Sequence, residues 1–273
     1  MAFDLLSSIG AGFSGGAIVK LLDYGYQEYR RRSEASKTAK NITDKHMDPI
    51  LKSADELVGK IRSLAQADFQ ELIRAPMPGN AEGQSCWSPY LSLVYLFAQF
   101  WCRVQILRIE SLFVNLAADA RGKRLLAFFD ALEATKNRLT ERAWERGMGE
   151  VIMEQTSSGE RVLTFAEFVD RFLSAEEFRR WFQPLMAVLS RLRHTRERQR
   201  LLAYGVILHA LIDTLDSEHA VTRNRDGWSN KLTDRTTRDL RYRVFRTYLP
   251  FVEESNRYLR AETKGLPRKT KRP

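Results

Sequence analysis

The chain has 273 residues, of which 44% are hydrophobic, and its formal net charge is +10. This length allows one large or two small domains, and five Trp and fifteen Phe residues supply a packed core, which excludes a disordered body. Half of the net charge lies in the last ten residues, where five basic side chains stand without an acid. The rest of the chain is therefore only mildly basic.

The N-terminal 32 residues carry the strongest signal in the sequence. The segment from Leu5 to Val19 has no charged residue and contains a GxxxG pair, a spacing that lets two helices approach closely. Three tyrosines (24, 26 and 29) and three consecutive arginines (30–32) follow it as an aromatic and basic collar. We predict that this segment docks to a membrane or a partner through Leu5, Leu6, Ile9, Gly12, Phe13, Gly16 and Val19.

Several interpretations of this segment stay open. A spanning helix needs about 20 apolar residues, so the fifteen uncharged residues are short. If Lys20 places its ammonium at the interface, the apolar stretch continues through Leu22. Asp4 argues against a secretory signal, which begins with a positive region. The segment is expected to insert in or lie on a membrane, with the arginines and the body on the cytoplasmic side, or to pack as a glycine-rich helix against protein. A disordered arm is the third interpretation.

The remaining sequence predicts an all-α, multi-helix, bundle-like domain around a central apolar helix. We divide the chain into an anchor or docking helix over 1–32, a helical domain over 33–262 and a disordered basic tail over 263–273. The two cysteines form no CxxC motif and imply no disulfide framework.

The first half of the domain predicts two helices and a loop. Residues 17–46 carry an amphipathic helix into a polar stretch, and Asp48–Pro49 predicts a new helix over about 49–73, because Asp favours an N-cap and Pro a first turn. Three prolines and two glycines in 74–89 predict a long loop, which is a candidate mobile or partner-contacting element. Residues 90–118 predict the central core helix, since their first dozen residues are apolar on every face, and Leu96, Phe97, Phe100 and Trp101 are expected to be buried.

The second half predicts shorter helices. Residues 122–147 form one amphipathic helix, and Gly147 and Gly149 mark a break or a kink in it. Residues 150–164 form either a small β-hairpin or an extension of that helix to about 154. The capping boxes Thr164-x-x-Glu167 and Ser174-x-x-Glu177 predict helices that start at 165 and 175.

The C-terminal part predicts two long helices joined by a loop. Pro184 kinks or restarts a helix that runs to about 216, a polar loop covers 217–230, and the last helix covers about 234–261.

Two stretches of the chain are rich in arginine, one over 191–200 and one over 235–246. They predict basic faces that bind nucleic-acid phosphates, anionic lipid or an acidic partner. The alternative is a solvated, salt-bridged surface, and an arginine bias is also expected of a GC-rich genome. The predicted polyanion-binding residues are Arg191, Arg193, Arg196, Arg238, Arg241, Arg246, Lys269, Lys271 and Arg272.

The weak metal candidates are His209, Asp213, Asp216 and His219, which follow one helix at spacings that bring them near one another. A metal site there would need ligands from a second helix, and the sequence has no second motif of this kind. The alternative is a helix end with a His209–Asp213 hydrogen bond and solvated acids. No P-loop, dinucleotide-binding, HExxH or GxSxG motif is present, and we expect no cofactor.

These patterns favour a non-enzymatic, membrane-associated or assembly protein that docks through its N-terminus to a membrane surface or a protein partner, with homo-oligomers an open possibility. The expected location is a cytoplasmic body, peripheral or single-anchored at the inner membrane. The runner-up is a soluble nucleic-acid-binding protein that uses the C-terminal arginines. A third hypothesis is a metal-dependent helical enzyme.

Overall fold

The computed structural model describes residues 3–75, 88–157, 159–228 and 231–259, with side chains from Tyr24 onward except at positions 25, 28 and 88. Helices make up 71% of the structure and the strands among the described residues form one antiparallel pair, which confirms the predicted all-α fold and the hairpin near 150–164. The predicted loop over 74–89 and the basic tail over 263–273 lie mostly or wholly outside these residues. The elements are α1 (Phe3–Gln66), α2 (Gln70–Arg74), α3 (Ser88–Glu110), η2 (Leu116–Ala118), α4 (Ala120–Glu133), α5 (Arg142–Val151), β1 (Met153–Thr156), β2 (Gly159–Val162), α6 (Phe165–Ser174), α7 (Glu176–Arg180), α8 (Gln183–Leu189), α9 (Thr195–Leu215), α10 (Asp234–Asp239), η3 (Leu240–Phe245) and η4 (Ser255–Tyr258).

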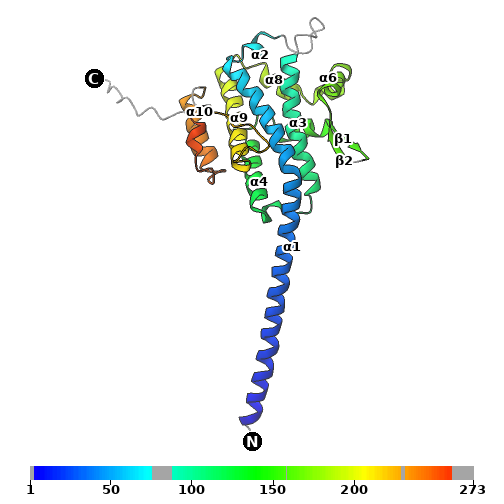
Figure 1. Cartoon of the computed structure of the whole chain (residues 1–273), viewed down its shortest axis with the longest axis vertical. Coiled ribbons are helices and arrows are strands. Elements are labelled where there is room, and N and C mark those ends of the chain that lie inside the picture. The colour runs from blue at the N-terminus through cyan, green and yellow to red at the C-terminus, as the bar shows by residue number, and fades with distance from the viewer. Residues whose placement is uncertain (1–2, 76–87, 158, 229–230, 260–273) are drawn as a thin grey trace, which may run out of the picture.

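The body is a bundle built around α3, α9 and the C-terminal half of α1, with α4 beside α9 (Figure 1). The β1–β2 hairpin and α6 flank one side of this bundle, and α10 flanks the other. The N-terminal half of α1 projects alone from one end of the body. The loop over 217–228 ties α9 back to α1 through Arg225 and Asp55, whose side chains lie 2.9 Å apart.

Helix α1 passes through Pro49 without a break, so the predicted restart at Asp48–Pro49 is wrong. An internal proline costs a helix about 3 kcal/mol. The stripe through Ile50, Leu57 and Ile61 is fully buried against α3 and α9. Burial of each such side chain stabilises the fold by about 1.5–3 kcal/mol. Tertiary burial therefore outweighs the proline. The helix ends at Gln66, earlier than 73, because Asp68 and Phe69 take left-handed backbone angles (φ 48° and 60°).

The central apolar helix is α3, and Phe97, Phe100 and Trp101 are buried as predicted, whereas Leu96 is only half-buried. It is the one helix among the residues with described side chains that is long and apolar enough to cross a membrane, over Pro89–Glu110. Since 72% of that window is buried inside the body, its apolar character fits a core helix.

The region predicted as one helix over 122–147 is two helices, α4 and α5. Asp119 caps α4 by accepting a hydrogen bond from the Gly122 amide. The glycines at 147 and 149 do not break a helix, because both lie inside α5. A Cβ at Gly149 would stand 2.7 Å from the backbone of Trp101, so this glycine lets α5 pack directly on α3.

The two capping boxes have different outcomes. Thr164 and Glu167 form the predicted reciprocal pair at the start of α6. Ser174 instead donates its hydroxyl to the carbonyl of Asp170, and α7 begins after Ala175 without a side-chain cap, so the second box is wrong.

The two long C-terminal helices are also interrupted. A helix does restart at Pro184, but α8 ends at Leu189 and α9 begins only at Thr195. The last predicted helix, over 234–261, is the short α10, a π-helical turn (η3) and the 3-10 turn η4. Pro250 lies where a continuous helix would need its amide, which explains why the helix stops before it.

Candidate functional site

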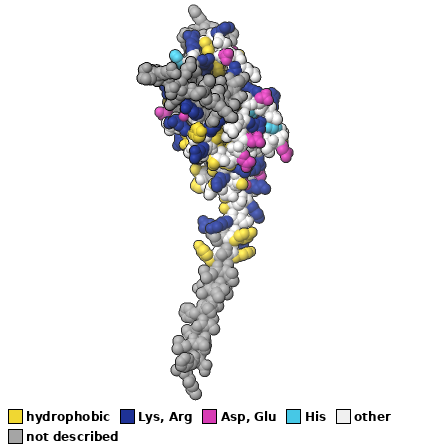
Figure 2. Space-filling view, turned by 90° about the vertical axis from the view of Figure 1, so that its left-hand side faces the viewer, with side chains coloured by type: hydrophobic (Ala, Val, Ile, Leu, Met, Phe, Trp, Pro, Cys, Tyr) yellow, Lys and Arg dark blue, Asp and Glu magenta, His cyan; other side chains and the backbone are white. Residues whose placement is uncertain are grey.

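The N-terminal half of α1 is the first candidate site. Tyr24, Tyr26 and Tyr29 are 71%, 65% and 72% exposed, and among the described side chains of the helix the first buried one is Ala39. Residues 3–38 thus form a stalk that, at about 1.5 Å per residue, extends about 54 Å beyond the body. The predicted docking residues, from Leu5 to Val19, occupy the outer part of this helix, where side chains are not described. Figure 2 shows that the first described side chains of the stalk are hydrophobic and basic.

Apolar side chains are also exposed on the body at the end from which the stalk leaves. Glu110 at the end of α3 binds Lys45 and His46 of α1, the latter at 2.6 Å, which fixes this end of α3 beside α1. The next turn exposes Leu112 (72%) and Phe113 (95%). The sequence places both in the core helix predicted over 90–118, but α3 ends at Glu110 and the chain turns. The sequence feature that could have indicated this end of the helix is Asn115, whose side chain caps the next short helix, η2.

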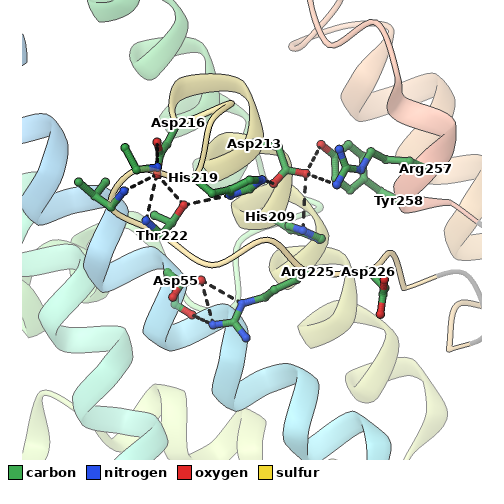
Figure 3. Close-up of polar contacts among 12 residues, drawn as sticks. Asp55, His209, Asp213, Asp216, His219, Thr222, Arg225, Asp226, Arg257 and Tyr258 are labelled. Atoms are coloured by element: carbon green, nitrogen blue, oxygen red, sulfur yellow. Dashed lines mark hydrogen bonds and ion pairs between the residues drawn. The ribbon is translucent and has the colours of Figure 1, made fainter.

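The second candidate is a buried polar cluster around Asp213 of α9 (Figure 3). The Tyr258 hydroxyl donates to Asp213 Oδ2 at 2.8 Å, and the Arg257 guanidinium lies 3.3 Å from the same oxygen. His209 Nε2 lies 3.6 Å from Asp213 Oδ2, and His219 Nε2 lies 3.7 Å from Oδ1. The structure therefore brings three of the four metal candidates together, but with an arginine and a tyrosine already on the carboxylate.

Burial controls the protonation of this cluster. It lowers the pKa of His209 to about 4, despite the nearby Asp213 carboxylate, so the imidazole is neutral at neutral pH. The Trp228 indole N–H donates to His209 Nδ1 at 3.0 Å, which leaves the proton of the neutral ring on Nε2, facing Asp213. Burial and the hydrogen bond to Asp213 raise the pKa of Tyr258.

Asp216, the fourth metal candidate, organises the loop that follows α9. It accepts hydrogen bonds from the amides of Ala220, Val221 and Thr222 and from the Thr222 hydroxyl. Burial alone would raise the pKa of Asp216, but these hydrogen bonds outweigh it and lower the pKa. The acids at this helix end are thus buried and bonded, whereas the alternative interpretation expected them to be solvated.

The geometry of the Asp213 cluster fits the fixing of a loop better than it fits chemistry on a substrate. His209 is only 1% exposed, so no substrate reaches its ring. Within the described residues no group of three or more His, Cys, Asp or Glu side chains is placed to hold a metal ion. What the contacts do is join α9 to the 217–228 loop and to η4.

The predicted polyanion-binding arginines have different surroundings in the structure. Arg191, Arg238 and Arg246 are exposed, Arg193 donates to the carbonyl of Ile73, and Arg241 contacts Asn256. Lysine and arginine side chains are spread over this side of the body with acidic ones among them (Figure 2). Lys269, Lys271 and Arg272 lie outside the described residues.

Arg196 differs from the other predicted arginines, because it lines a surface pocket together with Arg235 and Arg243 of the second basic stretch. This arrangement could not be predicted from spacing along the sequence, because it depends on the path of the loop between α9 and α10.

Comparison with protein-family models, with curated protein sequences and with solved structures finds no match to this chain.

Proposed function

We propose that this chain is a membrane-tethered helical protein whose N-terminal segment inserts in a lipid bilayer and whose body binds its partners from the end of a stalk. The observation that carries the proposal is the single helix α1, which continues for 36 residues before Ala39, the first buried side chain among those that the structure describes. A helix without tertiary packing is only marginally stable in water, and Gly10, Gly12, Gly15 and Gly16 weaken it further. Something outside the chain therefore has to stabilise it.

Lipid suits the outer part of the stalk better than water does. Leu5–Val19 is uncharged, and a bilayer tolerates glycines in a helix because every backbone group is already bonded within the helix. Tyr24, Tyr26 and Tyr29 then lie at the depth of the headgroups, with Arg30–Arg32 on the cytoplasmic side. Residues 23–38 would hold the body about 24 Å from the membrane, at about 1.5 Å per residue.

The competing partner for the stalk is a protein helix that packs on the small-residue face around Gly12 and Gly16. The exposed Leu112 and Phe113 at the same end of the body would suit such a partner as well. Insertion in lipid is the simpler proposal, because it uses the whole uncharged circumference of residues 5–19 rather than one face.

The test is fractionation of cells that express the full chain, the double variant Ile9→Asp/Phe13→Asp, and the matched control Ala35→Asp. A charge at the membrane centre costs about 2.5–3.5 kcal/mol, so the double variant is expected in the soluble fraction. The control adds a charge to the exposed part of the same helix, at Ala35, and is expected to stay with the membrane. Full-length protein that is soluble and monomeric without detergent would contradict insertion.

Gly12→Leu separates lipid from a protein partner. Insertion is expected to remain or to strengthen, because leucine is more apolar than glycine. Close packing on another helix is expected to be lost, because leucine keeps the two backbones apart. Release of Gly12→Leu from the membrane fraction would therefore favour the partner helix.

A further inference from the structure

A basic pocket lies between the N-terminal turns of α9, the α10–η3 segment and the short loop after α4. Its volume is about 830 Å³, the size of a small-molecule site. Gln199 joins two of its walls: its amide donates to the carbonyl of Lys231 at 2.9 Å and accepts from the Thr233 amide at 2.9 Å. The pocket is therefore held by hydrogen bonds between α9 and the start of α10.

Positive charge dominates the lining of this pocket. Five cationic side chains line it against one carboxylate, that of Asp239: Lys136, Arg196, Arg200, Arg235 and Arg243. Two of the five already have acidic partners, since Arg200 binds Glu197 at 2.7 Å and Arg243 lies 3.3 Å from Asp239. For the other three, the described part of the chain provides no ion pair. They come from three different segments and converge on one space.

The N-terminus of α9 adds a second attraction for anions. Thr195 and Arg196, the first two residues of this 21-residue helix, line the pocket. The N-cap residue His194 makes no side-chain hydrogen bond to the first turn, and its carbonyl accepts from the amides of Glu197 and Arg198, so the amides of Thr195 and Arg196 are left for another acceptor. A helix N-terminus with free amides favours a phosphate group.

We propose that this pocket binds the phosphate group of a small phosphorylated molecule. One carboxylate would be neutralised by a single arginine, whereas a phosphate dianion uses several cations and the bidentate geometry of guanidinium groups. A nucleic-acid strand needs a basic groove that follows its backbone, whereas on the face seen in Figure 2 the basic side chains are dispersed among acidic ones.

The position of the pocket favours a soluble phosphorylated molecule over the headgroup of a membrane lipid as the ligand. This choice rests on the proposed membrane insertion. Arg193, just before α9, contacts Ile73 beyond the C-terminal end of α1. Arg121 binds both Asp44 and the carbonyl of Leu215, which places the other end of α9 where the stalk leaves. The pocket is thus at the end of the body away from the membrane.

The test is calorimetric titration of the full chain in non-ionic detergent with inorganic pyrophosphate, with sodium chloride at equal ionic strength as the reference. Saturable binding is expected for the unmodified chain, and at least tenfold weaker binding for Arg196→Gln/Arg235→Gln. The matched control is Arg191→Gln/Arg238→Gln, which removes the same charge from exposed positions outside the pocket. It is expected to bind within twofold of the unmodified chain.

Three results would overturn the proposal: no saturable binding, equal weakening in both double variants, or an oligonucleotide that binds without competition from pyrophosphate. Binding to vesicles that contain a phosphoinositide, with none to pyrophosphate, would overturn the soluble source. If circular dichroism shows that the pocket variant is unfolded, Lys136→Gln on the loop after α4 replaces it, with the same expected loss. Fractionation of cells tests membrane insertion separately, so failure of one proposal is distinct from failure of the other.

Discussion

The two halves of α1 form one helix for different reasons. Residues 39–66 are held by a buried stripe against α3 and α9, strongly enough to keep Pro49 inside the helix. None of the described side chains between residues 24 and 38 is buried, and the outer residues contain four glycines within seven positions. In the body, tertiary packing can therefore override the helix propensity of single residues. In the stalk, the helix depends on that propensity and on the environment around it. This difference is the basis of the proposal that a membrane covers the outer half of the helix.

The largest expected effect is in the body. Phe100→Ala is expected to lower the free energy of unfolding by about 3–5 kcal/mol, because Phe100 is 0% exposed at the centre of α3. Urea unfolding followed by circular dichroism measures this change. A loss below about 1 kcal/mol would mean that α3 is not the core of the domain.

The second effect is a pH dependence that belongs only to the body. Burial raises the pKa of Glu145 to about 8 from its ordinary value of 4.5. Above pH 4.5 the unfolded chain releases this proton while the native chain keeps it, so the stability contributed by this group falls as the pH rises toward 8. His209, whose pKa is lowered to about 4, has the opposite slope between pH 4 and its ordinary value of 6.5. The glutamate effect is therefore clearest above pH 6.5.

Glu145→Gln tests this assignment, because glutamine keeps the shape and cannot ionise. It is expected to remove a fall of about 2 kcal/mol in the free energy of unfolding between pH 6.5 and 8. Chemical denaturation at several pH values gives the slope. An unchanged slope in the variant would show that Glu145 is ionised in the native protein.

The same contrast explains which features could be predicted from the sequence. The core helix and the Thr164–Glu167 cap follow from local patterns and are present. The continuation of α1 through Pro49 and the inclusion of Gly149 in α5 depend on helices distant in sequence, so a local reading breaks both helices.

The candidate sites divide in the same way. The pairing of His209 with Asp213 follows from helical spacing, but Arg257 and Tyr258 reach Asp213 only because η4 folds back on α9. The basic pocket likewise needs the loop between α9 and α10 to bring Arg196 and Arg235 together. Spacing along one helix is readable in the sequence, whereas contact between helices depends on the tertiary fold.

Replacing Pro49 tests how the packed half of α1 tolerates its proline. Pro49→Ala is expected to raise the free energy of unfolding by about 1–3 kcal/mol, since alanine restores an amide and removes the ring from the preceding turn. Thermal and urea unfolding measure the gain. A destabilised variant would indicate that the helix is interrupted at this position and that the proline fits the interruption.

The smallest expected effect concerns the stalk. Deletion of residues 1–32 removes no buried side chain that is described, so the free energy of unfolding of the body is expected to change by less than about 0.5 kcal/mol. Urea unfolding of both forms in the same detergent makes the comparison, because detergent covers the apolar segment in the full chain. Loss of membrane association together with unchanged stability would show that the stalk works as a tether only. A loss of several kcal/mol would instead mean that the outer half of α1 packs on the body, and the contrast between the two halves of the helix would not hold.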